Sequence, residues 1–170
     1  MSRFQISPTK QWNATGFPLE AGVTYRIVCR AVPDREGRPY MDKAIPCTPD
    51  GPVGWKGWLF DRFGRDARSR WNPAGWNRRD RIKRLRVMAD RHGRRASFLT
   101  VIGCVGRVRE DELERHVFVV GSSCMVKPDQ SGELHLFSND WPGDPGLPPE
   151  DQPYANNKGG IEVEVSEASG

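Results

Sequence analysis

The sequence predicts an all-β protein that folds as a sandwich of two sheets. Of its 170 residues, 18 are glycine and 14 are proline, a density of chain-breaking residues that is typical of short strands joined by turns. Two segments, 132–137 and 160–165, alternate polar and apolar residues, which is the pattern of strands with one face in a core and the other in solvent. A chain of this length can bury one core, so we expect one domain over residues 1–170.

The first expected strands are a short edge strand at 4–6 and a longer strand at 25–31, where β-branched and aromatic residues follow a turn. Proline and glycine recur through residues 32–57, which we expect to form long loops. Four further strands are expected at 97–105, 117–121, 133–137 and 161–165. Alternation within the third of these predicts that His135 faces solvent. The proline-rich connection 138–160 is expected to be loop throughout.

A basic segment interrupts this β pattern. Between residues 62 and 95 the sequence has 13 Lys or Arg and 3 Asp, a local net charge of +10, whereas the whole chain carries +4. Asn77 can cap a helix that Gly93 ends, and an apolar stripe runs through the residues between them. We therefore expect one basic α-helix at 78–92, within an insertion at about 62–95 of the sandwich.

Oxygen-bearing side chains gather in the last long connection. Asp140 follows the strand expected at 133–137, and Asn156 and Asn157 precede the strand expected at 161–165. The glycines just after Asn157 allow the chain to turn there. Calcium takes six to eight oxygen ligands from carboxylates, amides and backbone carbonyls. The sequence therefore predicts a calcium site at this end of the sandwich.

The same residues carry a resemblance to a known family. The pattern G-E-L-x-L-F-x-N-D at 132–140, followed by Tyr-x-Asn-Asn-x-Gly at 154–159 and a final alternating strand, resembles the galactose-binding PA-I lectin (PA-IL-like) family. The run L-T-V-I-G at 99–103 is similar to the apolar strand of that family that ends in Ile-Gly. The resemblance implies a jelly-roll β-sandwich, of the galactose-binding-domain-like type, that binds carbohydrate with the help of Ca²⁺.

The resemblance also implies a set of metal ligands. In the family an Asp, two Asn and two backbone carbonyls hold the ion. Carried over to this sequence, these are Asp140, Asn156, Asn157 and the backbone carbonyls of Pro153 and Tyr40. The early-loop ligand is the least firmly matched, and Asp42 is the neighbouring alternative to Tyr40.

A calcium ion with incomplete protein coordination can accept two hydroxyls of a sugar. The resemblance implies carbohydrate contacts by Asp140, Asn156 and Trp141, whose indole could pack on a sugar ring. This chain departs from the family by an insertion at 143–152, and the family's His and Gln sugar contacts have no match here. The sugar, galactose-like or acidic, is left open. A homo-oligomer is expected because linking weak sites raises avidity.

The basic segment supports an alternative function. Aromatic residues that alternate with arginine can stack bases while the guanidinium groups follow the phosphates, so this segment could bind nucleic acid or another polyanion. The contacts would come from the basic residues of the expected helix, namely Arg78, Arg79, Arg81, Lys83, Arg84 and Arg86. A further alternative is a metal-free protein-interaction domain on the same fold, because fold does not fix function.

Other function classes find little support in the sequence. It contains neither a G-x-S-x-G nor an H-E-x-x-H motif, and we do not expect an enzyme. The four cysteines are widely spaced, without a C-x-x-C pair, and are expected to be free, buried thiols. Mean hydropathy is -0.67, so no membrane span is expected. The first residues lack the apolar core of a secretory signal, and a cytoplasmic location is expected.

Overall fold

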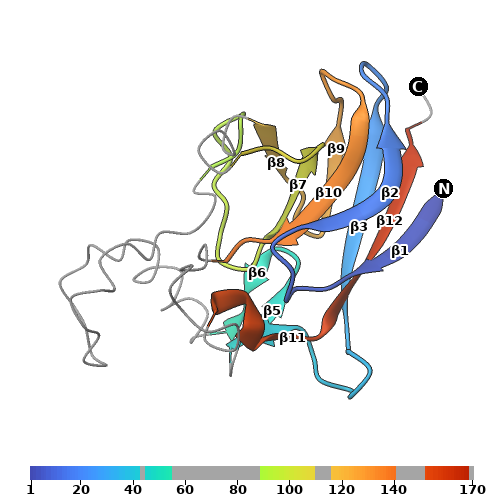
Figure 1. Ribbon diagram of the computed structural model, residues 1–170. Coiled ribbons are helices and arrows are strands. Elements are labelled where there is room, and N and C mark those ends of the chain that lie inside the picture. Colours follow the sequence, from blue (N-terminus) through green and yellow to red (C-terminus); the bar gives the residue numbers. More distant parts are fainter. Residues whose placement is uncertain (43–44, 55–88, 110–115, 141–151, 169–170) are drawn as a thin grey trace.

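The computed structural model describes residues 1–42, 45–54, 89–109, 116–140 and 152–168 (Figure 1). In this part of the chain all strand pairs are antiparallel. The first sheet consists, in spatial order, of β1 (Ser2–Ile6), β12 (Gly160–Glu167), β3 (Tyr25–Val32) and β9 (Ser123–Val126). The second consists of β2 (Asn13–Leu19), β10 (Gly132–Ser138), β7 (Val101–Val105) and β8 (Val117–Val119). The predicted all-β sandwich is confirmed.

A third, smaller set of strands closes one end of the sandwich. It runs in the order β11 (Asn157–Lys158), β4 (Met41–Asp42), β5 (Ile45–Thr48) and β6 (Gly51–Pro52), and lies at the lower end of Figure 1. A short 3₁₀ helix, η3 (Pro153–Asn156), leads into β11. The expectation that residues 32–57 and 138–160 form only loops is therefore wrong in part. These strands have two to four residues and form through pairing with distant segments, which leaves little local signal.

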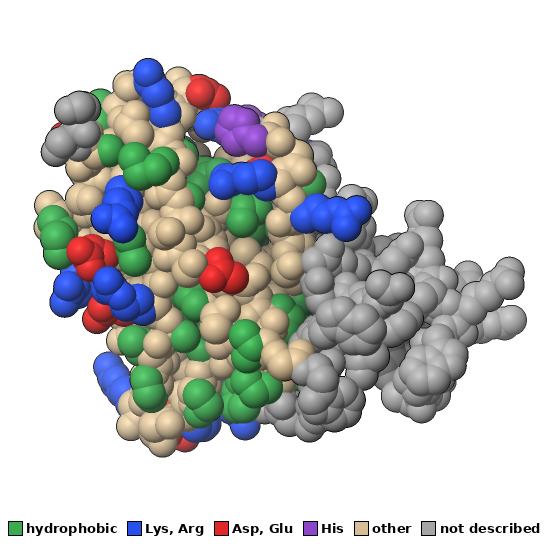
Figure 2. Space-filling view, turned by 180° about the vertical axis from the view of Figure 1, so that it is seen from behind, with side chains coloured by type: hydrophobic (Ala, Val, Ile, Leu, Met, Phe, Trp, Pro, Cys, Tyr) green, Lys and Arg blue, Asp and Glu red, His purple; other side chains and the backbone are tan. Residues whose placement is uncertain are grey.

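The main core lies between the two large sheets. Inward residues of β3 and β12 alternate with exposed ones as the sequence pattern predicts, so that Ile27, Ile161 and Val163 are fully buried. On the outer face of the first sheet, Glu162 and Glu164 lie near arginines of the neighbouring strands. Figure 2 shows acidic side chains flanked by basic ones on the face seen from behind. Such exposed ion pairs add little stability each.

The second sheet is buried on both faces at its inner strand β7, whereas its edge strand β2 keeps exposed residues. All five residues of β7 are buried, and Ile102, Val117 and Phe137 belong to a second apolar cluster. The side chain of His135 is only 12% exposed and its ring meets that of Trp12 edge to face at 5.9 Å. The expectation that His135 faces solvent is wrong, because apolar and aromatic side chains cover this face as well.

The predicted basic helix falls largely outside the described residues, since positions 78–88 are not among them. Its last four residues, 89–92, are described and are not helical. Ala89 instead forms an isolated antiparallel bridge with Arg95, and the residues between them make a turn that ends at Gly93 and Arg94. Within the described part of the chain, no helix is long and apolar enough to cross a membrane.

The expected strand at 97–105 begins later than predicted. Residues 97–100 form a turn, and β7 starts at Val101. Leu99 in this turn has a φ of 54°, a left-handed backbone conformation that a residue with a side chain adopts at a cost of about 1–2 kcal/mol. The apolar sequence alone, without glycine or asparagine at this position, does not indicate the turn. All four cysteines are free and buried, as predicted.

Candidate functional site

The predicted metal ligands come from two segments that meet beside the small sheet. Asp140 follows β10, whereas Asn156 ends η3 and Asn157 begins β11. Pairing of β11 with β4 places Asn157 opposite Asp42. Asp140 and Asn157 are only 2% and 3% exposed, and Asp42 is also buried. The structure thus brings together Asp140, both asparagines and the neighbouring alternative Asp42.

The side-chain amide of Asn157 has a fixed orientation. Its Nδ2 donates hydrogen bonds to Asp140 Oδ2 and to the backbone carbonyl of Pro8, each at 3.1 Å. These two acceptors occupy both amide hydrogens. The carbonyl oxygen, Oδ1, is therefore turned away from them, and it is buried without a hydrogen-bond partner in the part of the chain that the structure describes.

Asn156 repeats this feature one residue earlier. Its Oδ1 is also buried and has no hydrogen-bond partner among the described residues. A buried amide oxygen without a partner costs about 1–3 kcal/mol of folding free energy, and most buried polar atoms are satisfied. Asn157, which bonds the buried carboxylate of Asp140, and Asn156, one residue earlier in the chain, thus each provide a hard oxygen donor of the kind that calcium takes.

Asp140 is held by the backbone that precedes it. The peptide groups of Asn139 bond the turn at 97–100, through Leu99 N–H to Asn139 O at 2.7 Å and Asn139 N–H to Thr100 O at 2.8 Å. The Asn139 side chain donates to the carbonyl of Ser97 at 3.0 Å. Ser138, Asn139 and Asp140 are all buried. The strained turn at Leu99 therefore anchors the segment that carries the carboxylate, and strain of this kind is typical of functional sites.

Tyr40 is present at the site, mainly as a structural residue. Its hydroxyl donates to Leu99 O at 2.6 Å and contacts Ser138 Oγ at 2.9 Å, and burial raises the pKa of this phenol well above 10. The backbone carbonyl of Tyr40, the predicted ligand, accepts a hydrogen bond from Cys47 N–H at 3.0 Å. One of its two lone pairs is thus used within the small sheet.

The thiol of Cys47 lies beside the site and is neutral. Burial raises its pKa to about 12, a backbone hydrogen bond from Asp42 opposes this rise, and the charges of Asp42 and Asp140 add to it. The charges of both carboxylates therefore influence the same buried thiol. A protonated thiol is a poor metal ligand, which favours oxygen over sulfur as the donor here.

Several predicted site residues cannot be placed. Trp141 and the insertion, apart from Gln152, lie outside the described residues, as do all six basic residues of the polyanion alternative. Pro153 begins η3, three residues before Asn156. Among the described residues, no group of three or more His, Cys, Asp or Glu is arranged for a metal. The candidate site instead combines carboxylates with asparagine amides.

Two contacts of the site were not predicted. The carbonyl of Pro8 accepts from Asn157, and the carboxylate of Asp34 accepts from the backbone N–H of Gly159 at 3.4 Å. Pro8 acts through its backbone, which leaves no sequence signal. Asp34 belongs to a short motif, D-R-E-G-R, whose aspartate and glycine could have indicated a closed turn.

Comparison with solved structures finds a similar fold. The chain is similar to a structure described as "EclA N-terminal domain; PllA-like lectin", with a TM-score of 0.50 and 16% sequence identity. The alignment covers 99% of this chain and 97% of that one. At this identity the similarity shows the fold alone. That protein is described as a lectin, which agrees in kind with the resemblance found in the sequence, whereas membership of the PA-I lectin family stays a prediction.

No protein-family model matches the chain, and no curated protein matches it by sequence.

Proposed function

We propose that this protein binds carbohydrate through a calcium ion held by Asp140, Asn156 and Asn157. The observation that supports this proposal most strongly is the pair of buried, partnerless amide oxygens on consecutive residues beside a buried carboxylate. We infer that one cation contacts both oxygens. The similarity in fold to a protein described as a lectin gives the proposal a second, independent support.

The donor set favours calcium over other common metals. Carboxylate and amide oxygens are ligands for hard cations, and calcium tolerates the irregular geometry that a 3₁₀ helix and a two-residue strand provide. Zinc and copper sites use histidine or thiolate, and the only thiol described beside this site stays protonated. When bound, the calcium ion would supply a positive centre that accepts sugar hydroxyls in place of water.

The residues of the chain would orient the ligands. Asn157 Nδ2 is held by Pro8 O and Asp140 Oδ2, so that its oxygen is already directed away from both before a metal arrives. Asp140 would supply negative charge, and its anchored backbone would keep it in place. A site that is arranged in advance loses less entropy on binding than one that must be ordered.

The early-loop ligand has two candidates. The carbonyl of Tyr40, expected from the resemblance, already accepts the hydrogen bond of Cys47. Asp42 lies directly across from Asn157 and is buried. A second carboxylate would make the calcium complex closer to neutral and bind the ion more tightly. If Asp42 is a ligand, Asp42→Asn weakens calcium binding; an unchanged affinity leaves the Tyr40 carbonyl.

A glycan array tests the proposal. The wild-type protein should bind a subset of glycans in calcium and lose this binding in excess chelator, and Asp140→Asn should not bind in either condition. Asp90→Asn is the matched control, because Asp90 is equally buried but contacts β8 and its own turn. This control should bind glycans normally. Binding that persists in chelator and disappears at high salt would support the polyanion alternative instead.

A further inference from the structure

The chain contains one five-residue motif twice. The sequence D-R-E-G-R occupies 34–38 and D-R-H-G-R occupies 90–94. In both copies the aspartate N–H donates to the carbonyl of the last arginine, at 3.0 and 2.9 Å, and the glycine N–H donates to the aspartate carbonyl at 2.9 Å. Both glycines have a φ of 75°. The two segments therefore form the same closed turn.

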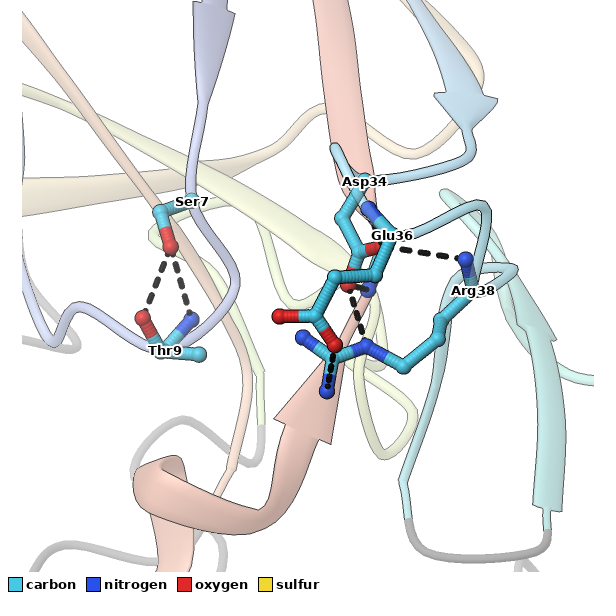
Figure 3. Close-up of polar contacts among 6 residues, drawn as sticks. Ser7, Thr9, Asp34, Glu36 and Arg38 are labelled. Atoms are coloured by element: carbon cyan, nitrogen blue, oxygen red, sulfur yellow. Dashed lines mark hydrogen bonds and ion pairs between the residues drawn. The ribbon is translucent and has the colours of Figure 1, made fainter.

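The aspartate side chain organises each turn in the same way. One oxygen, Oδ1, accepts two backbone N–H groups, those of Glu36 and Arg38 in the first turn, each at 2.9 Å. The other oxygen, Oδ2, accepts the guanidinium of Arg38 at 2.7 Å. The second turn repeats these contacts at 2.9, 2.9 and 2.8 Å. Figure 3 shows Asp34, Glu36 and Arg38 pointing toward one another in the first turn.

The two turns differ in the backbone N–H group, outside the turn, from which the aspartate accepts a hydrogen bond. Asp90 Oδ2 accepts the N–H of Val119 in β8, at 3.0 Å. Asp34 Oδ2 accepts the N–H of Gly159, which lies two residues after Asn157. The same closed turn is thus hydrogen-bonded to the second sheet in one case and to the segment that follows the candidate metal ligands in the other.

The position of the first turn explains why it matters for the site. The first sheet ends at the pair Gly160↔Val32, and the small sheet begins at the pair Lys158↔Met41. Between these two pairs, one side of the ladder has the single residue Gly159, whereas the other side has the longer segment 33–40. The Asp34 turn closes this longer side so that the pairing can resume at β4. This closure helps to set the register that brings Asp42 opposite Asn157.

Gly159 is fitted closely against the longer side. It has a φ of 81°, and a Cβ built on it would lie 2.5 Å from the Tyr40 Cα and N atoms. The two backbones are therefore in direct contact between the turn and the metal ligands. A displacement of residues 33–40 would be passed on to Gly159 and to Asn157.

A second turn supports Asn157 from the N-terminal segment. Asn13 bonds Ser7 N–H at 2.9 Å and donates to Ser7 O at 3.0 Å, which closes residues 7–13 and presents the Pro8 carbonyl to Asn157. Figure 3 shows this turn, through Ser7 and Thr9, in the same view as the Asp34 turn. Asn157 itself is thus held by Pro8, and the segment that follows it is held by Asp34.

We propose that Asp34 is a positioning residue for the metal site, which acts by folding residues 33–40 and holding Gly159 so that β11 keeps its register with β4. This inference rests on the proposed function, because it names how the calcium ligands are held. The hydrogen bonds described for Asp34 go to its own turn and to Gly159. Asp34 acts one step farther from the ion than an outer-shell partner, because it holds Gly159, two residues after Asn157. Loss of a direct outer-shell partner typically costs 10–100-fold in metal affinity.

The two copies of the motif provide a test variant, at Asp34, and a matched control, at Asp90. Asp34→Asn keeps one oxygen for the two backbone N–H groups of the turn, but it replaces the acceptor for Gly159 and Arg38 with an amide that donates. Asp90→Asn makes the same change in the second turn. Calcium affinity is measured by calorimetry on metal-stripped protein, and thermal melts without metal are measured alongside.

We expect Asp34→Asn to weaken calcium binding by up to about tenfold, the lower end of the range for direct outer-shell partners. We expect Asp90→Asn to leave calcium affinity unchanged, even where it lowers the melting temperature of the metal-free protein as much or more. Equal calcium affinity in Asp34→Asn and wild type would overturn the inference, and so would an equal loss in both variants, which would indicate a general effect of stability.

Hydrogen exchange separates this inference from the proposed function. In metal-free protein, Asp34→Asn should speed exchange of the backbone amides of residues 157–160, and Asp90→Asn should not. If wild-type protein gives no calcium heat, the proposed function fails, and faster exchange in Asp34→Asn alone still establishes that Asp34 holds this segment. Unchanged exchange in that variant would overturn the inference whatever the calcium result.

Discussion

At the scale of single residues, Asn13 differs from Asn156 and Asn157 in how its polar atoms are used. Asn13 uses all of its polar atoms, because its oxygen accepts from Ser7 N–H and its Nδ2 donates to Ser7 O and Leu136 O. The amide oxygens of Asn156 and Asn157, by contrast, have no hydrogen-bond partner among the described residues. The bonds of Asn13 stabilise the fold, whereas nothing described offsets the cost of burying the other two oxygens, as expected if they hold the proposed cation.

This difference predicts opposite effects of two alanine variants. Asn156→Ala removes an unsatisfied oxygen, so we expect the metal-free free energy of unfolding to change by less than about 1 kcal/mol, whereas Asn13→Ala should lose about 1–3 kcal/mol. Urea unfolding of metal-stripped protein measures both. Calcium at 100 times its wild-type Kd should stabilise the wild-type protein by about 2.7 kcal/mol and leave Asn156→Ala unaffected. Destabilisation of metal-free Asn156→Ala as large as that of Asn13→Ala would argue for a purely structural role.

The two turn aspartates predict how stability depends on pH. Burial disfavours the charged form of Asp34, but the hydrogen bonds from Arg38, Glu36 and Gly159 outweigh it and lower the pKa to about 2. Burial likewise opposes ionisation of Asp90, and bonds from Val119, Arg94 and His92 lower its pKa. In the unfolded chain an aspartate titrates near 3.9. The folded state therefore binds fewer protons than the unfolded state in this range.

The stability that these carboxylates provide is therefore fully present above about pH 4 and is lost as the pH falls toward 2. The double variant Asp34→Asn with Asp90→Asn should be less stable at pH 6 and should depend less steeply on pH between about 4 and 2. Urea midpoints of metal-free protein across this range measure the slope. An unchanged slope in the double variant would mean that other carboxylates govern acid unfolding.

At the scale of elements, sequence pattern predicted the strands that have one clear apolar face. β3, β10 and β12 lie close to their expected positions because alternation or β-branched composition marks them locally. β2 was missed because Gly16 and Pro18 interrupt it, and its pairing with β10 contains a register shift. The strands of the small sheet exist through distant partners, which no local pattern encodes.

Substitutions at Gly37 and Gly159 distinguish the cost of a left-handed backbone conformation from the cost of a steric clash. Gly37 and Gly159 both have positive φ, but a Cβ on Gly37 would meet nothing within 4 Å, whereas one on Gly159 would overlap the backbone at Tyr40. Gly37→Ala should cost about 1–2 kcal/mol from its backbone conformation alone. Gly159→Ala should cost more and should also weaken calcium binding, since it pushes β11 away from β4.

Denaturant unfolding and calcium calorimetry on the two glycine variants check this prediction. Gly93→Ala, in the second copy of the motif, is a further control, because its φ is also 75° and no atom lies near its Cβ. A calcium affinity of Gly159→Ala equal to that of Gly37→Ala would show that the contact with residues 39–40 does not position the site.

At the scale of the whole molecule, the sequence predicts the residues of the candidate site but not the residues that hold them in place. Asp140, Asn156 and Asn157 were singled out by their place in a family pattern, and the structure brings them together. Pro8 and Asp34 could not be predicted, because Pro8 contributes only a carbonyl and because the contact of Asp34 spans 125 residues. Long-range contacts of this kind follow from the closed fold and not from local sequence.

The measurement that tests the account most directly is a calcium titration of metal-stripped protein by calorimetry, with wild type, Asp140→Asn and Asp90→Asn compared. Asp90→Asn controls for the loss of a buried carboxylate elsewhere in the fold. We predict a saturable heat and a raised melting temperature in wild type and in Asp90→Asn, and neither effect in Asp140→Asn. Wild-type protein that gives no heat and no change in melting temperature with calcium would contradict the proposed metal site and the carbohydrate binding that depends on it.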